Sequence, residues 1–123
     1  MADEFRITSK IRLINGSLKV NIGGVYTFDQ NTAGGPAVGY LTIGTSEESV
    51  SLSELGTEGF AWFQNLDDTN YVQWGPDSGG SMVAVGRMKA GEVAGPFRLE
   101  PGLTLKMKAN TAACKVLAYV FEN

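Results

Sequence analysis

The sequence predicts an all-β fold: an antiparallel, jelly-roll-like β-sandwich with an N-terminal hairpin. Apolar and polar residues alternate with a period of two in many short segments, as in strands with one buried face. Turn-forming residues separate these segments, and the 123-residue chain contains 16 glycines. No segment carries the sustained apolar stripe of an amphipathic helix. An immunoglobulin-like sandwich is the alternative, but the chain offers about ten or eleven strands, more than that fold needs.

The first strand pair is predicted from residues 5–13, where apolar and polar residues alternate. Asn15 and Gly16 then form the strongest short hairpin signal, because both tolerate the positive φ of a type I′ turn. With these two residues as the loop, Leu13 pairs with Leu18, so apolar side chains share one face. The hairpin is expected to occupy residues 1–23 within a single domain of residues 1–123.

The opposite face of this hairpin is predicted to be basic. In the expected register Arg12 lies opposite Lys19, and the same side collects four cations: Arg6, Lys10, Arg12 and Lys19. Such a stripe is either a solvated face or a contact surface for an acidic partner. Both interpretations remain open from the sequence.

The remaining strands follow at short spacing and complete the predicted sandwich. Turn sequences such as Gly34-Gly35-Pro36 and Pro101-Gly102 separate them. The predicted strands are 25–28, 38–43, 49–52, 60–66, 71–74, 82–87, 93–99, 103–108 and 114–121. A jelly roll needs roughly eight core strands, which leaves the N-terminal hairpin as an addition.

Two strands rich in aromatic residues flank the turn sequence DDTN and are expected to form a hairpin. If Leu66 and Tyr71 border a four-residue turn, Phe63 lies opposite Trp74 on a core face. The other face then collects Phe60, Trp62 and Tyr71, together with Gln64, Leu66 and Gln73. The last strand likewise carries Leu117, Tyr119 and Phe121 on its second face.

This aromatic face is more apolar than a solvated sheet surface should be. Three alternatives follow for Phe60, Trp62 and Tyr71. A loop or terminal strand of the same chain covers them, they pack on another protein chain, or they form a platform for carbohydrate.

The composition argues against several classes of function. The chain has no histidine and a single cysteine, Cys114, which is expected to be a small buried hydrophobe. No nucleophile elbow, phosphate loop or dinucleotide fingerprint occurs. We therefore expect a non-enzymatic protein with no catalytic residues, no metal and no cofactor.

Charge and hydropathy narrow the possible partners. The net charge is −3 and the pI about 4.9, so nucleic acid is not expected as a partner. No signal peptide and no run of about 18 apolar residues is present, so no membrane segment is expected and the chain is placed in a cytoplasm.

Two long segments carry a resemblance to a known group of proteins. GYLTIGTSEESVSLSELGTEGFAWFQNLDDTNYVQWG and KAGEVAGPFRLEPGLTLKMKANTAACKVLAYVFE resemble small β-rich proteins encoded among the structural genes of tailed bacteriophages and prophages. The resemblance covers residues 40–122 and leaves the basic hairpin outside it. Its elements are ELGTEGF, NLDDTNYVQWG, the LEPG turn and KANTAAC.

The resemblance implies a role in the virion, assembled in the host cytoplasm. The role that the resemblance favours most is a capsid decoration or cement protein, and the next is a tail or head-fibre component. Such proteins bind a major capsid protein or another virion protein as homo-oligomers, often trimers. A carbohydrate-binding module with an aromatic platform remains the alternative from another class. No catalytic residues are implied by these motifs.

Overall fold

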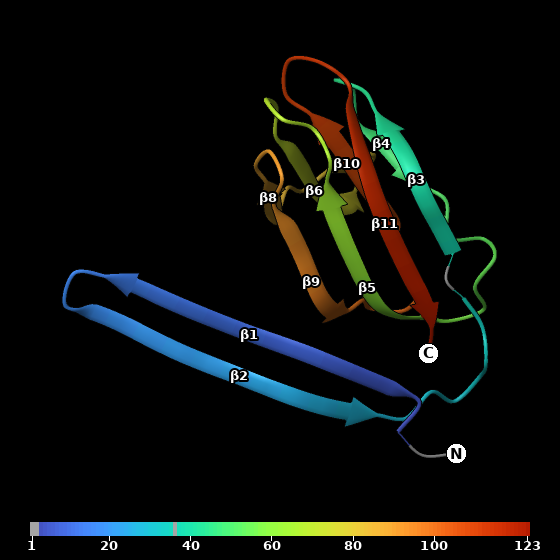
Figure 1. Cartoon of the computed structure of the whole chain (residues 1–123). Helices are drawn as coiled ribbons and strands as arrows, with labels where there is room; N and C mark the ends of the chain where they lie inside the picture. Colours follow the sequence, from blue (N-terminus) through green and yellow to red (C-terminus); the bar gives the residue numbers. More distant parts are fainter. Residues whose placement is uncertain (1–2, 36) are drawn as a thin grey trace. The chain divides into compact units, whose positions relative to one another are not determined.

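The computed structural model describes residues 3–35 and 37–123, and its contacts divide the chain into two compact units (Figure 1). Unit 1 is Met1–Thr32 and unit 2 is Ala33–Asn123. The sequence predicts one domain over residues 1–123, whereas the contacts treat the N-terminal hairpin as a unit of its own. The described residues form eleven strands, which confirms the all-β fold.

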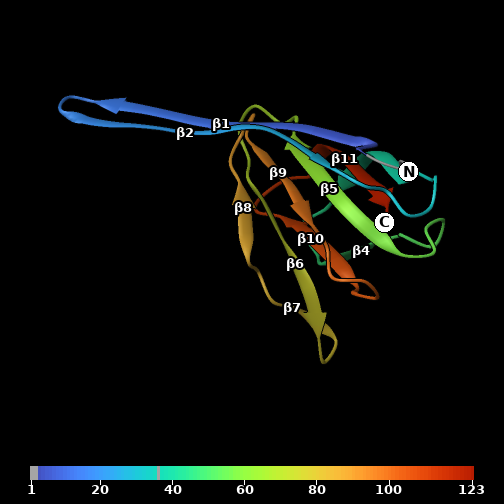
Figure 2. The same ribbon diagram turned by 90° about the horizontal axis from the view of Figure 1, so that it is seen from below.

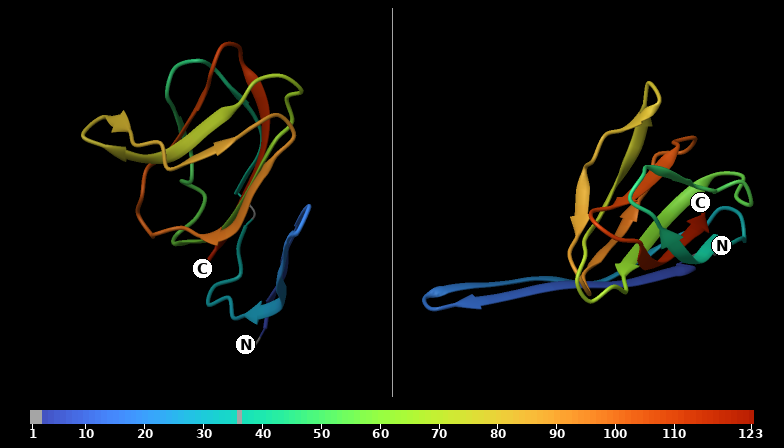
Figure 3. Two further views of the ribbon diagram at one scale, coloured as in Figure 1. Left: turned by 90° about the vertical axis from the view of Figure 1, so that its left-hand side faces the viewer. Right: turned by 90° about the horizontal axis from the view of Figure 1, so that it is seen from above.

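Unit 1 is an antiparallel hairpin of β1 (Phe5–Asn15) and β2 (Leu18–Phe28), which we call the arm (Figure 3). The predicted end of the hairpin at residue 23 is wrong, because β2 continues through Gly23 and Gly24. Gly23 has a φ of 114°, and a Cβ there would lie 2.0 Å from the Ser9 carbonyl oxygen. Gly23 therefore allows a close backbone approach inside a strand.

The predicted register of the arm is shifted by two residues. Gly16 and Ser17 are the loop residues, so that Leu13 pairs with Val20 and Arg12 pairs with Asn21. Gly16 has a φ of 59°, and Gly-Ser fits a type II′ turn, which takes Gly at its first central position. A shift of two keeps every side chain on its predicted face, but it removes the expected Arg12–Lys19 pair.

Unit 2 is an antiparallel β-sandwich (Figures 1 and 2). One sheet has the order β3 (Ala37–Ile43), β11 (Cys114–Glu122), β5 (Glu58–Asn65), β9 (Val93–Arg98). The other has the order β4 (Glu48–Val50), β10 (Leu105–Ala109), β6 (Val72–Ser78), β7 (Ser81–Met82), and β8 (Gly86–Met88) also pairs with β6.

The core lies between these two sheets. Strand β11 shows the pattern that builds it, because its alternate residues are buried completely: Cys114, Val116, Ala118 and Val120. From the other sheet come Val72, Met88, Leu105 and Met107, which are also inaccessible. Burying these side chains on both inner faces is the main source of stability in such a sandwich. Cys114 is thus the buried hydrophobe that the sequence predicts.

The predicted hairpin of residues 60–66 and 71–74 is wrong. Strand β5 pairs with β11 and β9, whereas β6 pairs with β10, β7 and β8, so the DDTN segment crosses from one sheet to the other. Phe63 and Trp74 still meet in the core, but across it, with ring centroids 5.7 Å apart in an edge-to-face arrangement. Phe97 completes the cluster, stacked on Trp74 at 5.0 Å.

The physical reason for the crossing is the buried Asn65 side chain. Its Nδ2 donates to the carbonyl oxygens of Asn70 and Met88, at 2.8 and 3.1 Å, and its Oδ1 accepts from the Asp67 N–H at 3.0 Å. The Asp67 carboxylate accepts from the N–H groups of Thr69 and Asn70. These bonds fold the segment into a compact loop that links the sheets.

Candidate binding surfaces

The outer face of the β3-β11-β5-β9 sheet carries an aromatic surface. Cross-strand pairing places Tyr119 beside Trp62, and it places Leu117 between Tyr40 and Gln64. Tyr40 is 70% exposed and the others are half-buried. We call Tyr40, Trp62, Leu117 and Tyr119 the aromatic sheet surface. It offers flat apolar area with polar atoms at the tyrosine hydroxyls and the Gln64 amide.

Phe60 lies on the same outer face, next to a basic side chain. The Arg98 guanidinium sits over the Phe60 ring at 4.4 Å from the centroid, and its Nη1 donates to Asn123 Oδ1 at 2.7 Å. This arrangement is a cation–π contact. The structure therefore gives Phe60 a neighbour within unit 2.

Tyr71 does not join Phe60 and Trp62, so the predicted grouping of the three is wrong. Tyr71 immediately precedes β6 in the second sheet, and the guanidinium of the exposed Arg87 covers its ring at 3.9 Å. The grouping depended on a hairpin between residues 60–66 and 71–74, and this hairpin does not form. The contribution of Phe60, Trp62 and Tyr71 to a protein interface stays a prediction.

Sequence reasoning missed Tyr40 as a member of the aromatic surface. The alternation of residues 38–43 places Tyr40 on the face of the strand opposite to the buried Ile43. Only the pairing of β3 with β11 shows that Tyr40 lies beside Leu117. The apolar second face of the last strand was the signal that pointed to Leu117 and Tyr119, and the structure places both on this surface.

The arm presents an apolar face that the register defines. Ile11 pairs with Ile22 and Leu13 with Val20, and Leu18 and Tyr26 lie on the same side. Ile11 is 61% exposed and Ile22 56% exposed. We call these six residues the arm apolar face: Ile11, Leu13, Leu18, Val20, Ile22 and Tyr26. It contains no charged side chain.

The other side of the arm is the predicted basic stripe. Arg6, Lys10, Arg12 and Lys19 share this face and all four are exposed. Neither β1 nor β2 contains an acidic residue. We call this side the arm basic face. It is a local positive surface on a chain whose net charge is −3.

Unit 2 also contains an apolar pocket at one end of the sandwich. It has a volume of about 250 Å³, and Trp74, Phe97, Leu99, Leu103 and Leu105 contribute to its lining. Trp74 reaches this position because Gly86 has no side chain: a Cβ there would lie 2.3 Å from the indole Cε2. The volume suits one apolar side chain or a small ring.

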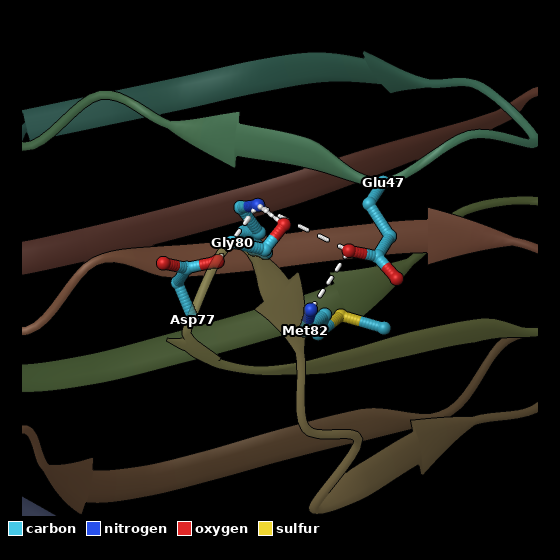
Figure 4. A network of polar contacts seen from close by, with 5 residues as sticks. Glu47, Asp77, Gly80 and Met82 are labelled. Carbon is cyan, nitrogen blue, oxygen red and sulfur yellow. Dashed lines mark hydrogen bonds and ion pairs between the residues drawn. The ribbon is translucent and has the colours of Figure 1, made fainter.

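A polar network ties three segments of unit 2 together (Figure 4). The Lys106 ammonium lies 2.9 Å from Asp77 Oδ1 and 4.0 Å from Glu47 Oε1, and it donates to the Gly80 carbonyl. The hydrogen bond and charge of Lys106 lower the pKa of Asp77. Glu47 also accepts from the Met82 N–H at 2.7 Å. This network fixes the β6–β7 turn onto β10.

The described residues offer little for metal or thiol chemistry. Within residues 3–35 and 37–123 no cluster of three or more His, Cys, Asp or Glu side chains is placed to hold a metal ion. Burial, followed by the charge of Asp67, raises the pKa of the Cys114 thiol. The same part of the chain has no helix with the length and apolarity needed to cross a membrane.

Comparison with known proteins finds no relative of this chain. No protein-family model matches the chain, and neither a curated protein nor a solved structure matches it.

Proposed function

We propose that this protein is a non-enzymatic structural component of a bacteriophage particle, with capsid decoration as its first role. The arm attaches the protein to an acidic part of the shell, and the sandwich of unit 2 is the rigid body displayed on it. A tail or head-fibre position is the variant of the same proposal. The site of action is the virion, assembled in the host cytoplasm.

The observation that carries this proposal is the two-faced arm. Its strands have eleven residues each, twice the usual strand length. One face is apolar and exposed, and the other holds four exposed cations. An isolated two-stranded ribbon is marginally stable in water, so such an arm is suited to becoming ordered against other protein surfaces. Multivalent attachment to a symmetric shell lets weak individual contacts add up.

The resemblance of residues 40–122 to virion proteins is the reason for proposing a phage shell as the binding partner. Its motifs fall on features that build the sandwich: NLDDTNYVQWG spans the loop held by Asn65, and LEPG forms the turn before β10. They describe a fold element rather than a reactive site. The attachment chemistry therefore comes from the arm.

The proposal is tested on purified particles of the phage or prophage that encodes the chain. Electron microscopy of particles with and without the gene product should show difference density on the head, and purified protein should restore it. Absence of the chain from particles, by mass spectrometry, would contradict the proposal. Density on the tail alone would select the tail variant.

A second candidate function is carbohydrate binding, favoured by the aromatic sheet surface. Tyr40, Trp62 and Tyr119 offer ring faces of the kind that stack on sugars, with Gln64 as a nearby polar group. Titration with a glycan panel, followed by tryptophan fluorescence, tests it. A spectral shift that disappears in Trp62→Ala would support this function.

A further inference from the structure

We infer that unit 2 binds an extended peptide segment of another protein at its apolar pocket. An aromatic side chain of the peptide occupies the pocket, and the peptide main chain lies along the edge of β9. The occupant is thus a benzyl or indole side chain together with the peptide bonds beside it. This site lies in the sandwich of unit 2 and does not depend on the proposed attachment through the arm.

The pocket lies between the two sheets. Trp74 comes from β6 and Phe97 from β9, and their rings are stacked with 5.0 Å between the centroids. Leu99, Leu103 and Leu105 contribute to the lining around them. The three leucine side chains offer no hydrogen-bonding group, so this lining favours an apolar ring over a polar side chain.

The volume of the pocket sets the size of the occupant. An apolar cavity of about 150 Å³ in another protein holds benzene. The pocket of about 250 Å³ therefore has room for a benzyl or an indole group. The affinity of such a ring comes from the apolar surface that it removes from water.

The open edge of β9 is the reason to assign the ring to a peptide. β9 is the last strand of its sheet and pairs with β5 on one side (Figure 1). The N–H of Leu99, directly after β9, donates to the Gly59 carbonyl of β5 at 3.0 Å. Main-chain groups alternate in direction along a strand, so the N–H and C=O of Arg98 point away from β5. In the described part of the chain neither group has a hydrogen-bond partner.

The same alternation places the aromatic residue of the peptide. The Arg98 side chain lies on the outer face over Phe60, whereas Phe97 and Leu99 line the pocket. A peptide residue that pairs with Arg98 also has its side chain on the outer face, so the next residue points toward the pocket. Pro96 has no N–H, which keeps the added pairing short. Main-chain bonds to Arg98 then hold the peptide, and the pocket selects its side chain.

The test uses N-acetyl-glycyl-phenylalaninamide as the probe, titrated into the full isotope-labelled chain and followed by NMR. Its glycyl unit is expected to pair with Arg98 while the phenyl ring enters the pocket. The Trp74 indole signal and the Arg98 amide signal should shift and saturate, with a Kd on the order of 1 mM for a probe of this size. The Trp62 indole belongs to the aromatic sheet surface and should not shift. No saturating shift at Trp74, or a shift at Trp62 instead, overturns the proposal.

Two altered probes separate the ring from the main chain. N-acetyl-glycyl-alaninamide lacks the ring and should bind at least tenfold more weakly, because burial of the ring provides most of the affinity. Acetylglycolyl-phenylalaninamide has an ester oxygen in place of the glycyl N–H, so it cannot donate to the Arg98 carbonyl. It should bind about fivefold more weakly than the parent probe. Equal binding of the ester probe would leave a pocket for a ring alone and overturn the peptide site.

A substitution tests the pocket from the protein side. Leu103 is half-buried in the lining, and the larger side chain of Leu103→Trp would fill the space that the ring needs. Probe binding should fall at least tenfold. Val93→Trp makes a similar change at a 52% exposed position of β9 outside the lining and should bind as tightly as the unchanged chain. Unchanged binding in a folded Leu103→Trp protein overturns the proposal, and the probe series decides it without any substitution if that variant does not fold.

Discussion

Phe63 and Trp74 meet edge-to-face across the core of unit 2, with ring centroids 5.7 Å apart. Phe63 comes from β5 in one sheet and Trp74 from β6 in the other, so this contact joins the two layers. Only eleven positions separate them in sequence, and the loop ordered by Asn65 brings the chain from one layer to the next.

Removal of the Phe63 ring should destabilise the sandwich strongly. Phe63 is completely buried, and Phe→Ala substitutions in cores cost about 3–5 kcal/mol because a cavity remains. Urea unfolding followed by tryptophan fluorescence measures the change. Tyr40→Ala removes a similar volume at a 70% exposed position and should change the free energy of unfolding by less than about 1 kcal/mol.

The sequence predicts strands better than it predicts their partners. The alternation in residues 114–121 identifies the buried side of β11 correctly, because parity is a local property of one strand. Pairing depends on the connection instead. The segment after Asn65 has good turn residues, which suggested a hairpin. The Asn65 side chain instead donates to the carbonyl oxygens of Asn70 and Met88, and the alternation of apolar and polar residues does not encode these contacts.

The same distinction explains the candidate surfaces. The arm basic face was predicted correctly although the register was shifted, since a shift of two residues preserves the faces. Trp62 and Tyr71 were wrongly grouped because Trp62 lies in β5 of one sheet, whereas Tyr71 immediately precedes β6 of the other. Tyr40 was missed because its neighbour Leu117 is 77 positions away and only the β3–β11 pairing joins them.

Gly86→Ala should destabilise unit 2 by displacing the Trp74 indole. The added Cβ would lie 2.3 Å from Cε2 and 2.5 Å from Nε1, so the indole would have to leave its stacked position on Phe97. Overpacking of this kind typically costs 1–3 kcal/mol. Near-UV circular dichroism of the tryptophan band and thermal unfolding measure the effect.

Gly24→Ala is the control for Gly86→Ala. Its Cβ would meet the Tyr26 ring only at ordinary contact distances, 3.7 Å or more. The unfolding temperature of the sandwich should therefore stay unchanged. Equal effects of the two substitutions would contradict the steric account of Gly86.

Asn65→Leu should destabilise the connection between the sheets. The substitution keeps the side-chain size but leaves the carbonyl groups of Met88 and Asn70 and the N–H of Asp67 without their partner. The expected loss is on the order of 2–4 kcal/mol. Gln64→Leu makes the matching amide-to-leucine change on the outer face of the same strand. If both variants unfold at the same urea concentration as the unchanged chain, the Asn65 bonds are not what holds the loop.

The pKa of Asp77 should depend on Lys106. The hydrogen bond and charge of Lys106 lower this pKa below 3.8, so the ion pair stabilises the fold above that pH. Its contribution is lost as the pH falls through the lowered pKa, because the carboxylate is then protonated in the folded state as well. Carboxyl-carbon NMR titration should show the Asp77 pKa rising toward 3.8 in Lys106→Met.

Asp67 is the internal control for this titration. Its pKa is also lowered, but by the backbone N–H groups of Asn70 and Thr69. It should therefore stay low in Lys106→Met. A parallel rise of both values would indicate a general loosening of unit 2 rather than loss of one ion pair.

Charge reversal on the arm should weaken attachment to the shell while leaving the sandwich intact. Arg6→Glu, Lys10→Glu and Arg12→Glu replace three cations of the arm basic face with anions, which an acidic partner repels. Cosedimentation with particles should fall at least tenfold, and binding of the unchanged chain should weaken as salt rises from 50 to 500 mM because exposed charges are screened.

The control is a triple variant of unit 2 with the same change in net charge: Lys89→Glu, Lys108→Glu and Lys115→Glu. It should retain most of the binding. Equal losses from both triple variants would assign the attachment to overall charge, whereas full retention in the arm variant would remove the arm basic face from the contact.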